Sequence, residues 1–407
     1  MKELEDVMSS AAGSDLDSLA DALARYVRSG RPLSIADGSG VIGQLERRLG
    51  EVLNLPNPLT FASGTAGLHA AYLALDLPPG SEVVGAVNTF HASLSPAVHC
   101  GLNAVLVDVE PDTGNVSPAA LEAAIGPRTR CVTVTHFLGH PAAMEEITAI
   151  CRARDLRLIE DFSHAFLSTL EGQPVGAFGD VAVGSLQARK TLVAGEGGVL
   201  ATPHAELYER AVLAGHYRGR ALALADERLR AFGETGLGLK MRMHPLAAVV
   251  ALVNAEQLVE RVAARTALLQ RLSRHLGDVP GVRPPVVRPG ADMGGWFSYR
   301  PQIQLRELKP GVGADDYLRR LQEAGVPAHY PSIGPLHEEP LFTGTIPLQA
   351  AVSTWRPRVC GPLAGAAAFS KGRISVTVTG RDTAKTIDAY AQAFADVSRE
   401  LAVRDAA

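Results

Sequence analysis

The sequence predicts an α/β protein built around a mostly parallel sheet with helices on both of its faces. Six short apolar segments, each typical of a buried strand, alternate with helical stretches for much of the chain, near residues 83–87, 104–108, 131–135, 156–160, 180–184 and 198–201. Strands that alternate with helices in this way form parallel sheets. With 407 residues, the chain is long enough for a large and a smaller domain with separate cores.

The flanking elements follow from the spacing of apolar residues. Residues 1–40 indicate a helical arm followed by a stretch rich in Gly, Ser and Pro, and residues 245–276 indicate one long amphipathic helix leaving the large domain. We therefore predict a large domain over 1–262 and a small C-terminal α/β domain over 263–407. The small domain is predicted to contain helices near 315–324 and 383–401, strands near 298–304 and 373–378, and a proline-containing loop at 282–289.

The sequence around one lysine suggests that this residue forms a Schiff base. Lys190 lies between an apolar strand and a glycine-rich turn, in a chain with only six lysines and 33 arginines. A desolvated lysine can lose its proton and attack a carbonyl to form a Schiff base, which arginine cannot do. The alternative is a surface lysine beside a surface arginine, Arg189.

A carboxylate at the end of a predicted strand is the second candidate. Asp161 ends the apolar run 156–160, so it is expected to point into the crevice at the carboxyl ends of the parallel strands. There it would pair with a protonated pyridine nitrogen, the interaction that lets pyridoxal phosphate act as an electron sink. His164 would then donate to the phenolic oxygen of that cofactor. The alternative for Asp161 is a helix N-cap.

Two further segments fit the same cofactor. Ser63, Gly64 and Thr65 form a small-residue turn before an alanine-rich helix, where free amides and close backbone approach suit a phosphate. The alternative is a simple helix cap. Phe90 follows another predicted strand and would stack on a pyridine ring, although an aromatic residue at such a place is often ordinary core.

From about Val41 to the C-terminus, the chain resembles the DegT/DnrJ/EryC1/StrS family of sugar aminotransferases, which are fold-type I pyridoxal-phosphate enzymes. The motifs that carry the resemblance occur in the family's order: the Ser-Gly-Thr-Ala turn at 63–66, the stretches 105–113 and 135–141, Glu160 with Asp161, Ser185 with Lys190, and the glycine-rich turn after the lysine.

The resemblance implies a role for each candidate. Lys190 would hold pyridoxal 5′-phosphate as a Schiff base and Asp161 would pair with its pyridine nitrogen. His164 would lie by the phenolic oxygen and Phe90 over the ring. The phosphate would be held by Ser63, Gly64, Thr65 and Ser185.

One position departs from the family pattern. Many members supply an asparagine across a dimer interface, and Lys240 falls where that asparagine would be. The resemblance thus implies a homodimer with shared active sites, in which Lys240 would reach the phosphate of the neighbouring subunit. The alternative is that Lys240 is a solvated turn residue. Weaker substrate candidates are His216, Arg218, His329 and Tyr330, all in predicted loops.

The composition speaks against nucleic acid, metal ions and membranes as binding partners. The net charge of −4 and the pI of about 6.3 speak against nucleic-acid binding. The four cysteines are scattered without metal-binding spacing, which predicts reduced thiols in a cytoplasmic protein and no metal site. No apolar run is long enough to span a membrane, and the first residues do not resemble a signal peptide.

The family resemblance implies the function: amino-group transfer from L-glutamate or L-glutamine to a ketone or aldehyde, on a keto-sugar or a cyclitol, in a biosynthetic pathway of the kind that makes antibiotics. A sugar lyase or dehydratase is the alternative within the same cofactor chemistry, but in the family's dehydratases a histidine replaces the lysine at the position of Lys190. A regulatory protein that binds the cofactor without turnover is the alternative from another class.

Overall fold

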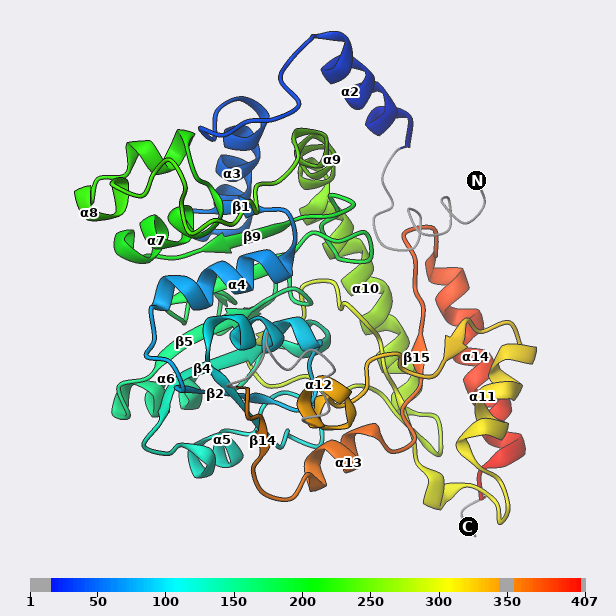
Figure 1. Cartoon of the computed structure of the whole chain (residues 1–407). Helices are drawn as coiled ribbons and strands as arrows, with labels where there is room; N and C mark the ends of the chain where they lie inside the picture. Colours follow the sequence, from blue (N-terminus) through cyan, green and yellow to red (C-terminus); the bar gives the residue numbers. More distant parts are fainter. Residues whose placement is uncertain (1–15, 344–354, 404–407) are drawn as a thin grey trace.

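The structure, a computed structural model, describes residues 16–343 and 355–403. The described chain begins with helix α2 (Leu16–Arg28), which lies at the edge of the molecule in Figure 1. The first part of the predicted arm, residues 1–15, lies outside the described residues. No helix within the two described ranges combines the length and the apolar character that a bilayer-spanning segment requires.

An eight-stranded sheet forms the centre of the large body, in the order β1-β9-β8-β5-β4-β2-β3-β14 (Figure 1). Neighbouring strands from β8 to β14 are parallel, whereas β9 runs antiparallel to both β8 and β1. The prediction of a mostly parallel sheet is confirmed. Its strands are β1 (Leu59–Phe61), β2 (Glu82–Ala86), β3 (Asn103–Val107), β4 (Thr129–Thr135), β5 (Arg157–Asp161), β8 (Val181–Ser185), β9 (Gly198–Ala201) and β14 (Arg358–Val359).

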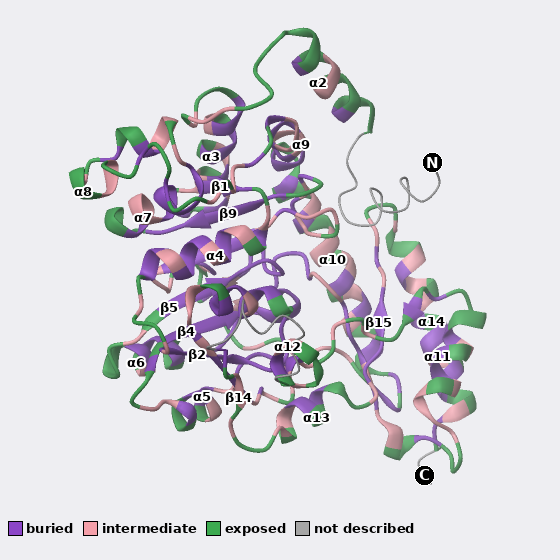
Figure 2. Cartoon of the chain, viewed as in Figure 1, coloured by how far each residue is buried: buried purple, intermediate pink, exposed green. Residues whose placement is uncertain are grey.

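Helices cover this sheet, whose strands are almost entirely buried (Figure 2). A small residue lets α4 approach β8 closely, because a Cβ atom added at Gly67 would lie 3.0 Å from Cγ1 of Val183. The helices of the large body are α3 (Gly40–Leu53), α4 (Gly64–Leu75), α5 (Pro118–Ala124), α6 (Met144–Ala153), α7 (Ala205–Gly215), α8 (Glu227–Arg230) and α9 (Pro245–Glu256).

The single helix predicted over 245–276 is wrong, because the structure has two helices, α9 and α10 (Leu258–Gly277). Gln257 leaves the helical region, with φ −101° and ψ 1°. Side-chain hydrogen bonds compensate for the break, since the guanidinium of Arg261 donates to the carbonyl oxygen of Asn254 at 2.9 Å. No proline or glycine marks this position, so the apolar spacing alone could not reveal it.

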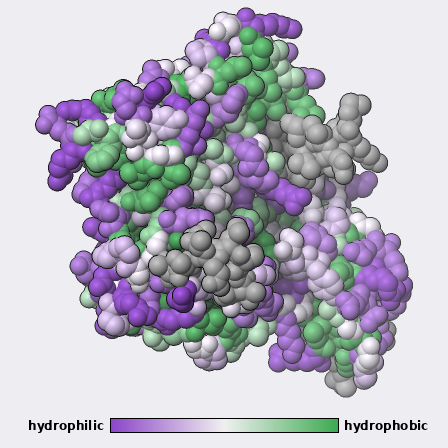
Figure 3. Space-filling model, viewed as in Figure 1, coloured by the Kyte–Doolittle hydropathy of each residue, from purple (hydrophilic) through white to green (hydrophobic). Residues whose placement is uncertain are grey.

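The C-terminal part has a second core, in which α10 packs against α14 (Ala384–Leu401) and α14 against α11 (Ala314–Glu323). In Figure 3 this part forms a lobe whose visible face is mostly hydrophilic. The predicted strands near 298–304 and 373–378 are much shorter, namely β12 (Gln302–Ile303) and β15 (Ser375–Val376). Pro301 has no N–H to donate, which explains why the ladder is interrupted beside it.

The remaining helices and strands of the described residues are short. They are β6 (Thr169–Leu170), β7 (Gln173–Pro174), β10 (Val282–Arg283), β11 (Ala291–Asp292), β13 (Ala328–His329), α12 (Pro340–Thr343) and α13 (Ala364–Ser370). The loop predicted at 282–289 therefore begins with two residues of strand. β11 pairs with β6, and β13 pairs with β15.

The chain after residue 262 does not stay within the small lobe. Strand β14 pairs with β3 in the large sheet, and Leu336, Phe342, Trp355 and Ala366 belong to the large core. The division into 1–262 and 263–407 stays a prediction, but the segment around β14 packs with the first part and not with the second.

Candidate active site

A cavity of about 1150 Å³ lies where the carboxyl ends of β2, β4, β5 and β8 meet the C-terminal part. This is the edge at which open α/β sheets bind their ligands. Residues from both cores line it. The predicted site residues among its lining are Ser63, Gly64, Thr65, Phe90, Asp161, His164, Ser185, Lys190 and His329.

Lys190 reaches this cavity from the turn that follows β8. Its backbone N–H donates to the carbonyl oxygen of Gln187 at 2.8 Å, which closes the turn. Burial lowers the pKa of the Lys190 ammonium to about 8, although the negative charge of Asp161 acts in the opposite direction. The Nζ atom lies 4.6 Å from the centre of the Phe297 ring. The side chain therefore loses its proton more readily than an ordinary lysine does.

Asp161, the last residue of β5, is held in place by hydrogen bonds. Its Oδ2 accepts from the hydroxyl of Ser93 at 2.6 Å, and its Oδ1 accepts from the backbone N–H of Ser163 at 3.0 Å. The Ser93 hydroxyl also contacts those of Thr89 and Thr135, at 2.8 and 3.0 Å. The next element along the described chain is strand β6, so the N-cap alternative for Asp161 is not supported.

His164 lies buried beside these two residues. Its ring stacks on that of Phe297, with 3.9 Å between the centroids and 4° between the planes. Burial, and then the charges of Lys190 and Arg300, hold the pKa of His164 well below its usual range. Its Nδ1 is buried without a hydrogen-bond partner in the described part of the chain. A neutral imidazole with an unsatisfied nitrogen is a feature that a bound ligand would complete.

The start of α4 packs directly on the end of β8. A Cβ atom added at Gly64 would lie 2.7 Å from Cβ of Ser185, so only glycine fits there without a shift. The hydroxyl of Ser63 accepts from the N–H of Ala66 at 3.0 Å and therefore caps the helix. The first amides of a helix have no partner within it. The Ser63 side chain thus caps the helix, and all four residues, Ser63, Gly64, Thr65 and Ser185, line the cavity, so that their contact with a phosphate stays a prediction.

Phe90 lies at the mouth of the same cavity. It is 47% exposed, so it is not an ordinary core residue. Its ring lies 4.3 Å from that of His91, between centroids. An exposed aromatic ring at the edge of a cavity can cover a planar ligand.

Four predicted residues lie outside the cavity lining. His216 is buried edge-on against Phe61, and burial lowers its pKa to about 3. Its backbone pairs with that of the exposed Lys240. Arg218 pairs with Glu234 at 3.1 Å, and the Tyr330 hydroxyl donates to Asp315. The structure therefore does not join these four to the site of their own chain, and their roles stay predictions.

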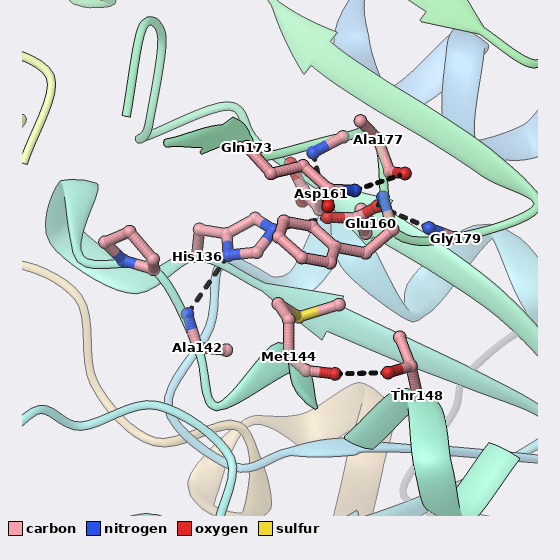
Figure 4. A network of polar contacts seen from close by, with 12 residues as sticks. His136, Ala142, Met144, Thr148, Glu160, Asp161, Gln173, Ala177 and Gly179 are labelled. Atoms are coloured by element: carbon pink, nitrogen blue, oxygen red, sulfur yellow. Dashed lines mark hydrogen bonds and ion pairs between the residues drawn. The ribbon is translucent and has the colours of Figure 1, made fainter. Parts of the chain in front are cut away.

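A buried polar network surrounds Glu160, the residue of β5 that precedes Asp161 (Figure 4). His136 accepts from the N–H of Ala142 at its Nδ1, so its Nε2 carries the hydrogen and donates to Glu160 at 2.9 Å. Both side chains are fully buried. The Glu160 carboxylate also accepts three backbone N–H groups at 2.6–2.8 Å, from Gly176, Phe178 and Gly179.

Several residues of the site were not predicted from the sequence, and three of them matter most for its geometry. Ser93 orients Asp161, Phe297 packs between His164 and Lys190, and Arg300 lines the cavity from the C-terminal part. The sequence held a partial signal only for Ser93, which lies just after the predicted strand 83–87.

Comparison with known proteins yields a family and several relatives. The model of the DegT/DnrJ/EryC1/StrS aminotransferase family matches residues 10–360. The chain is 30% identical over 306 residues to the dTDP-4-dehydro-2,3,6-trideoxy-D-glucose 4-aminotransferase of Saccharopolyspora spinosa, covering 74% of this chain and 78% of the other. It is 32% identical over 223 residues to the GDP-perosamine synthase of Escherichia coli O157:H7, covering 55% of this chain and 59% of that enzyme.

Solved structures agree on the fold. An aminotransferase from Psychrobacter cryohalolentis has a TM-score of 0.83 at 23% identity, over 97% of this chain and 99% of the other. The GDP-4-keto-6-deoxy-D-mannose-3-dehydratase of E. coli, solved with hydrated pyridoxal phosphate bound, has a TM-score of 0.79 at 17% identity, over 95% and 98%. At these identities the two likenesses show the fold alone.

Proposed function

Because the chain belongs to the DegT/DnrJ/EryC1/StrS aminotransferase family, we propose that it transfers an amino group from L-glutamate or L-glutamine to a keto-sugar or a cyclitol, with pyridoxal 5′-phosphate as cofactor. The observation that carries the proposal is Lys190, a lysine with a pKa lowered to about 8 that shares a cavity with Asp161 and His164. A desolvated lysine loses its proton more readily and is therefore suited to attack a carbonyl.

The residues of the cavity fit the cofactor. His164 has a buried nitrogen without a partner among the described residues, which the phenolic oxygen would satisfy. The Gly64–Ser185 contact keeps the start of α4 free of side-chain bulk, as a phosphate site requires. Asp161 would hold the pyridine nitrogen in its protonated form. When bound, the cofactor supplies an electron sink for the carbanion that amino-group transfer requires.

Lys190 would act twice in this reaction. It first holds the cofactor, and the amino donor then displaces it as a free amine. Its lowered pKa suits it to accept a proton from the substrate carbon and to return a proton to the cofactor carbon that received the amino group. Ser93 and Ser163 would keep Asp161 fixed while charge moves through the ring.

The acceptor class rests on the relatives. One relative is named as a GDP-perosamine synthase and another as a 4-aminotransferase of a dTDP-linked keto-sugar, and this chain is at least 30% identical to each. The cavity of about 1150 Å³ is large enough for a sugar beside the cofactor. A biosynthetic role in secondary metabolism, and a cytoplasmic location for a chain whose four cysteines are all free, belong to the same proposal.

The working unit in this proposal is a homodimer with shared sites. Support comes from the segment that carries Lys240, because large apolar side chains stand exposed close by in the sequence. Phe232 is 56% exposed and Leu237 49%. In the proposed dimer, a second subunit covers these side chains, and the Lys240 ammonium stabilises the phosphate of the neighbouring site.

Reduction with borohydride tests the function. The protein incubated with pyridoxal phosphate should turn yellow, and borohydride should fix the label to the peptide of Lys190. Lys190→Arg should bind cofactor without covalent fixation and should lose transamination with glutamate, because arginine supplies no free amine. Lys371→Arg, at an exposed lysine, is the matched control. Label on Lys240, or full activity in Lys190→Arg, would show that the assignment is wrong.

A further inference from the structure

Arg300 is one of only two buried arginines in the described part of the chain, and it differs from the other in how it is satisfied. Arg373 is 4% exposed and donates to four backbone carbonyl oxygens, those of Phe369, Arg300, Pro111 and Asp112. Arg300 is 5% exposed, and its guanidinium makes a single hydrogen bond to the described residues, from Nε to the hydroxyl of Ser298 at 3.2 Å.

No carboxylate of residues 16–343 and 355–403 pairs with Arg300. Burial lowers its pKa to about 10, and no acid opposes this effect. A charged guanidinium held out of water without a counter-ion is costly to the fold. Such a group persists where a ligand completes it, so the question is what Arg300 faces.

Arg300 faces the cavity that holds Lys190. His164 and His329 line the same cavity, and the charge of Arg300 adds to burial in lowering the pKa values of both. Beneath it lies Phe137, whose ring centre is 5.7 Å from the guanidinium carbon. The aromatic ring limits the positions that the side chain can adopt. The terminal nitrogens, for which no partner is recorded among the described residues, are therefore left for a bound molecule.

We propose that Arg300 binds a carboxylate of a substrate. A planar guanidinium matches a carboxylate with two parallel hydrogen bonds, a geometry that selects it over neutral hydroxyl or amide groups. The proposed phosphate residues Gly64, Thr65 and Ser185 come from the large body, whereas Arg300 comes from the C-terminal part. This inference rests on the proposed function and adds to it a contact residue, Arg300, for a carboxylate that belongs either to the amino donor, since glutamate and glutamine both carry one, or to an acidic keto acceptor.

Calorimetry on the cofactor-loaded protein tests binding without turnover. The probe is glutarate, a dicarboxylate with no amine or keto group, and its neutral diamide is the comparison. Arg300→Gln should weaken glutarate binding about ten- to a hundredfold. Arg300→Lys should retain part of the affinity. Arg306→Gln, at an exposed arginine six residues on, should leave it unchanged.

The two half-reactions identify the source of the carboxylate. If it belongs to the donor, Arg300→Gln raises the half-saturating concentration of L-glutamate and leaves that of keto-sugars unaffected. If it belongs to the acceptor, the effect appears with a nucleotide-linked keto-uronic acid and is absent with the corresponding 6-deoxy keto-sugar. In both cases the absorbance of the resting protein, which reports the cofactor held by Lys190, stays close to wild type.

The inference is overturned if the wild type does not bind glutarate, or if Arg300→Gln binds it as tightly as the wild type. It is also overturned if Arg300→Gln loses the same affinity for the neutral diamide as for glutarate. Failure of the proposed function would look different. The wild type would then transfer no amino group from any donor, while the calorimetric comparison of Arg300→Gln with Arg306→Gln would still report on the carboxylate site.

Discussion

Removing the charge of Asp161 should make Lys190 easier to deprotonate. In the cofactor-free protein, burial lowers the pKa of Lys190 to about 8, and the Asp161 carboxylate is the group that opposes this effect. Asp161→Asn removes the negative charge and nearly preserves the size of the side chain. The pKa of Lys190 must therefore fall further, and the free amine must appear at a lower pH.

The expected magnitudes follow from the pKa. With a pKa of about 8, roughly a quarter of Lys190 side chains carry no proton at pH 7.5, against about one in a thousand for an ordinary lysine. A fall of about one further unit, at the low end of what a neighbouring opposite charge supplies, would raise the unprotonated fraction at pH 7.5 to roughly three quarters. Asp161→Asn should thus label about three times faster at that pH.

Brief acetylation of the cofactor-free protein between pH 6 and 10 measures this fraction. Mass spectrometry of the digest gives the labelling of Lys190 relative to the exposed Lys385, which corrects for the reagent's own pH dependence. Thermal melting checks that Asp161→Asn remains folded, since its amide can still accept from Ser163. A midpoint near 10.5 in the wild type, or a midpoint that rises in Asp161→Asn, would refute the reasoning.

Two further outcomes are expected. Mixing Lys190→Ala with Lys240→Ala subunits should restore activity toward half of wild type per dimer at limiting cofactor, because one site then combines both intact lysines. No recovery despite proven subunit exchange would show that Lys240 serves no neighbouring site. Glu160→Gln should lower the free energy of unfolding by about 2–6 kcal/mol, because one side-chain oxygen that accepts two part-buried N–H groups is lost. A loss below about 1 kcal/mol in urea unfolding would contradict that account.

The parts of the site that could be predicted from the sequence are those attached to strands. Asp161 and Ser185 end apolar strands, and parallel neighbours bring their carboxyl ends to one edge of the sheet. The position of Lys190 then follows from its short distance along the chain. The same reasoning correctly predicted the central strands, because each is a buried apolar run with clear ends.

Phe297 and Arg300 could not be predicted in the same way. The chain reaches them through Gly294, Gly295 and Trp296, which all have positive φ angles, of 50°, 84° and 55°. Such a turn has no periodicity from which the direction of the next side chain can be read. Arginine is, in addition, usually an exposed residue, so a buried and unpaired one contradicts the general expectation. The role of Lys240 depends on a second chain.

The path of the chain around β14 constrains how the two cores can move. The polypeptide passes from the large core to the C-terminal one after α9, returns before Leu336 and leaves again after Ala366. A domain joined to its neighbour by one linker can rotate about that hinge, whereas a domain joined at several points cannot. Leu336 and Phe342, on the returning segment, also line the cavity. We therefore expect the cavity to open for substrate by small sliding displacements of packed segments. The segment that carries Leu336 and Phe342 would move with them, so the wall of the cavity would change shape.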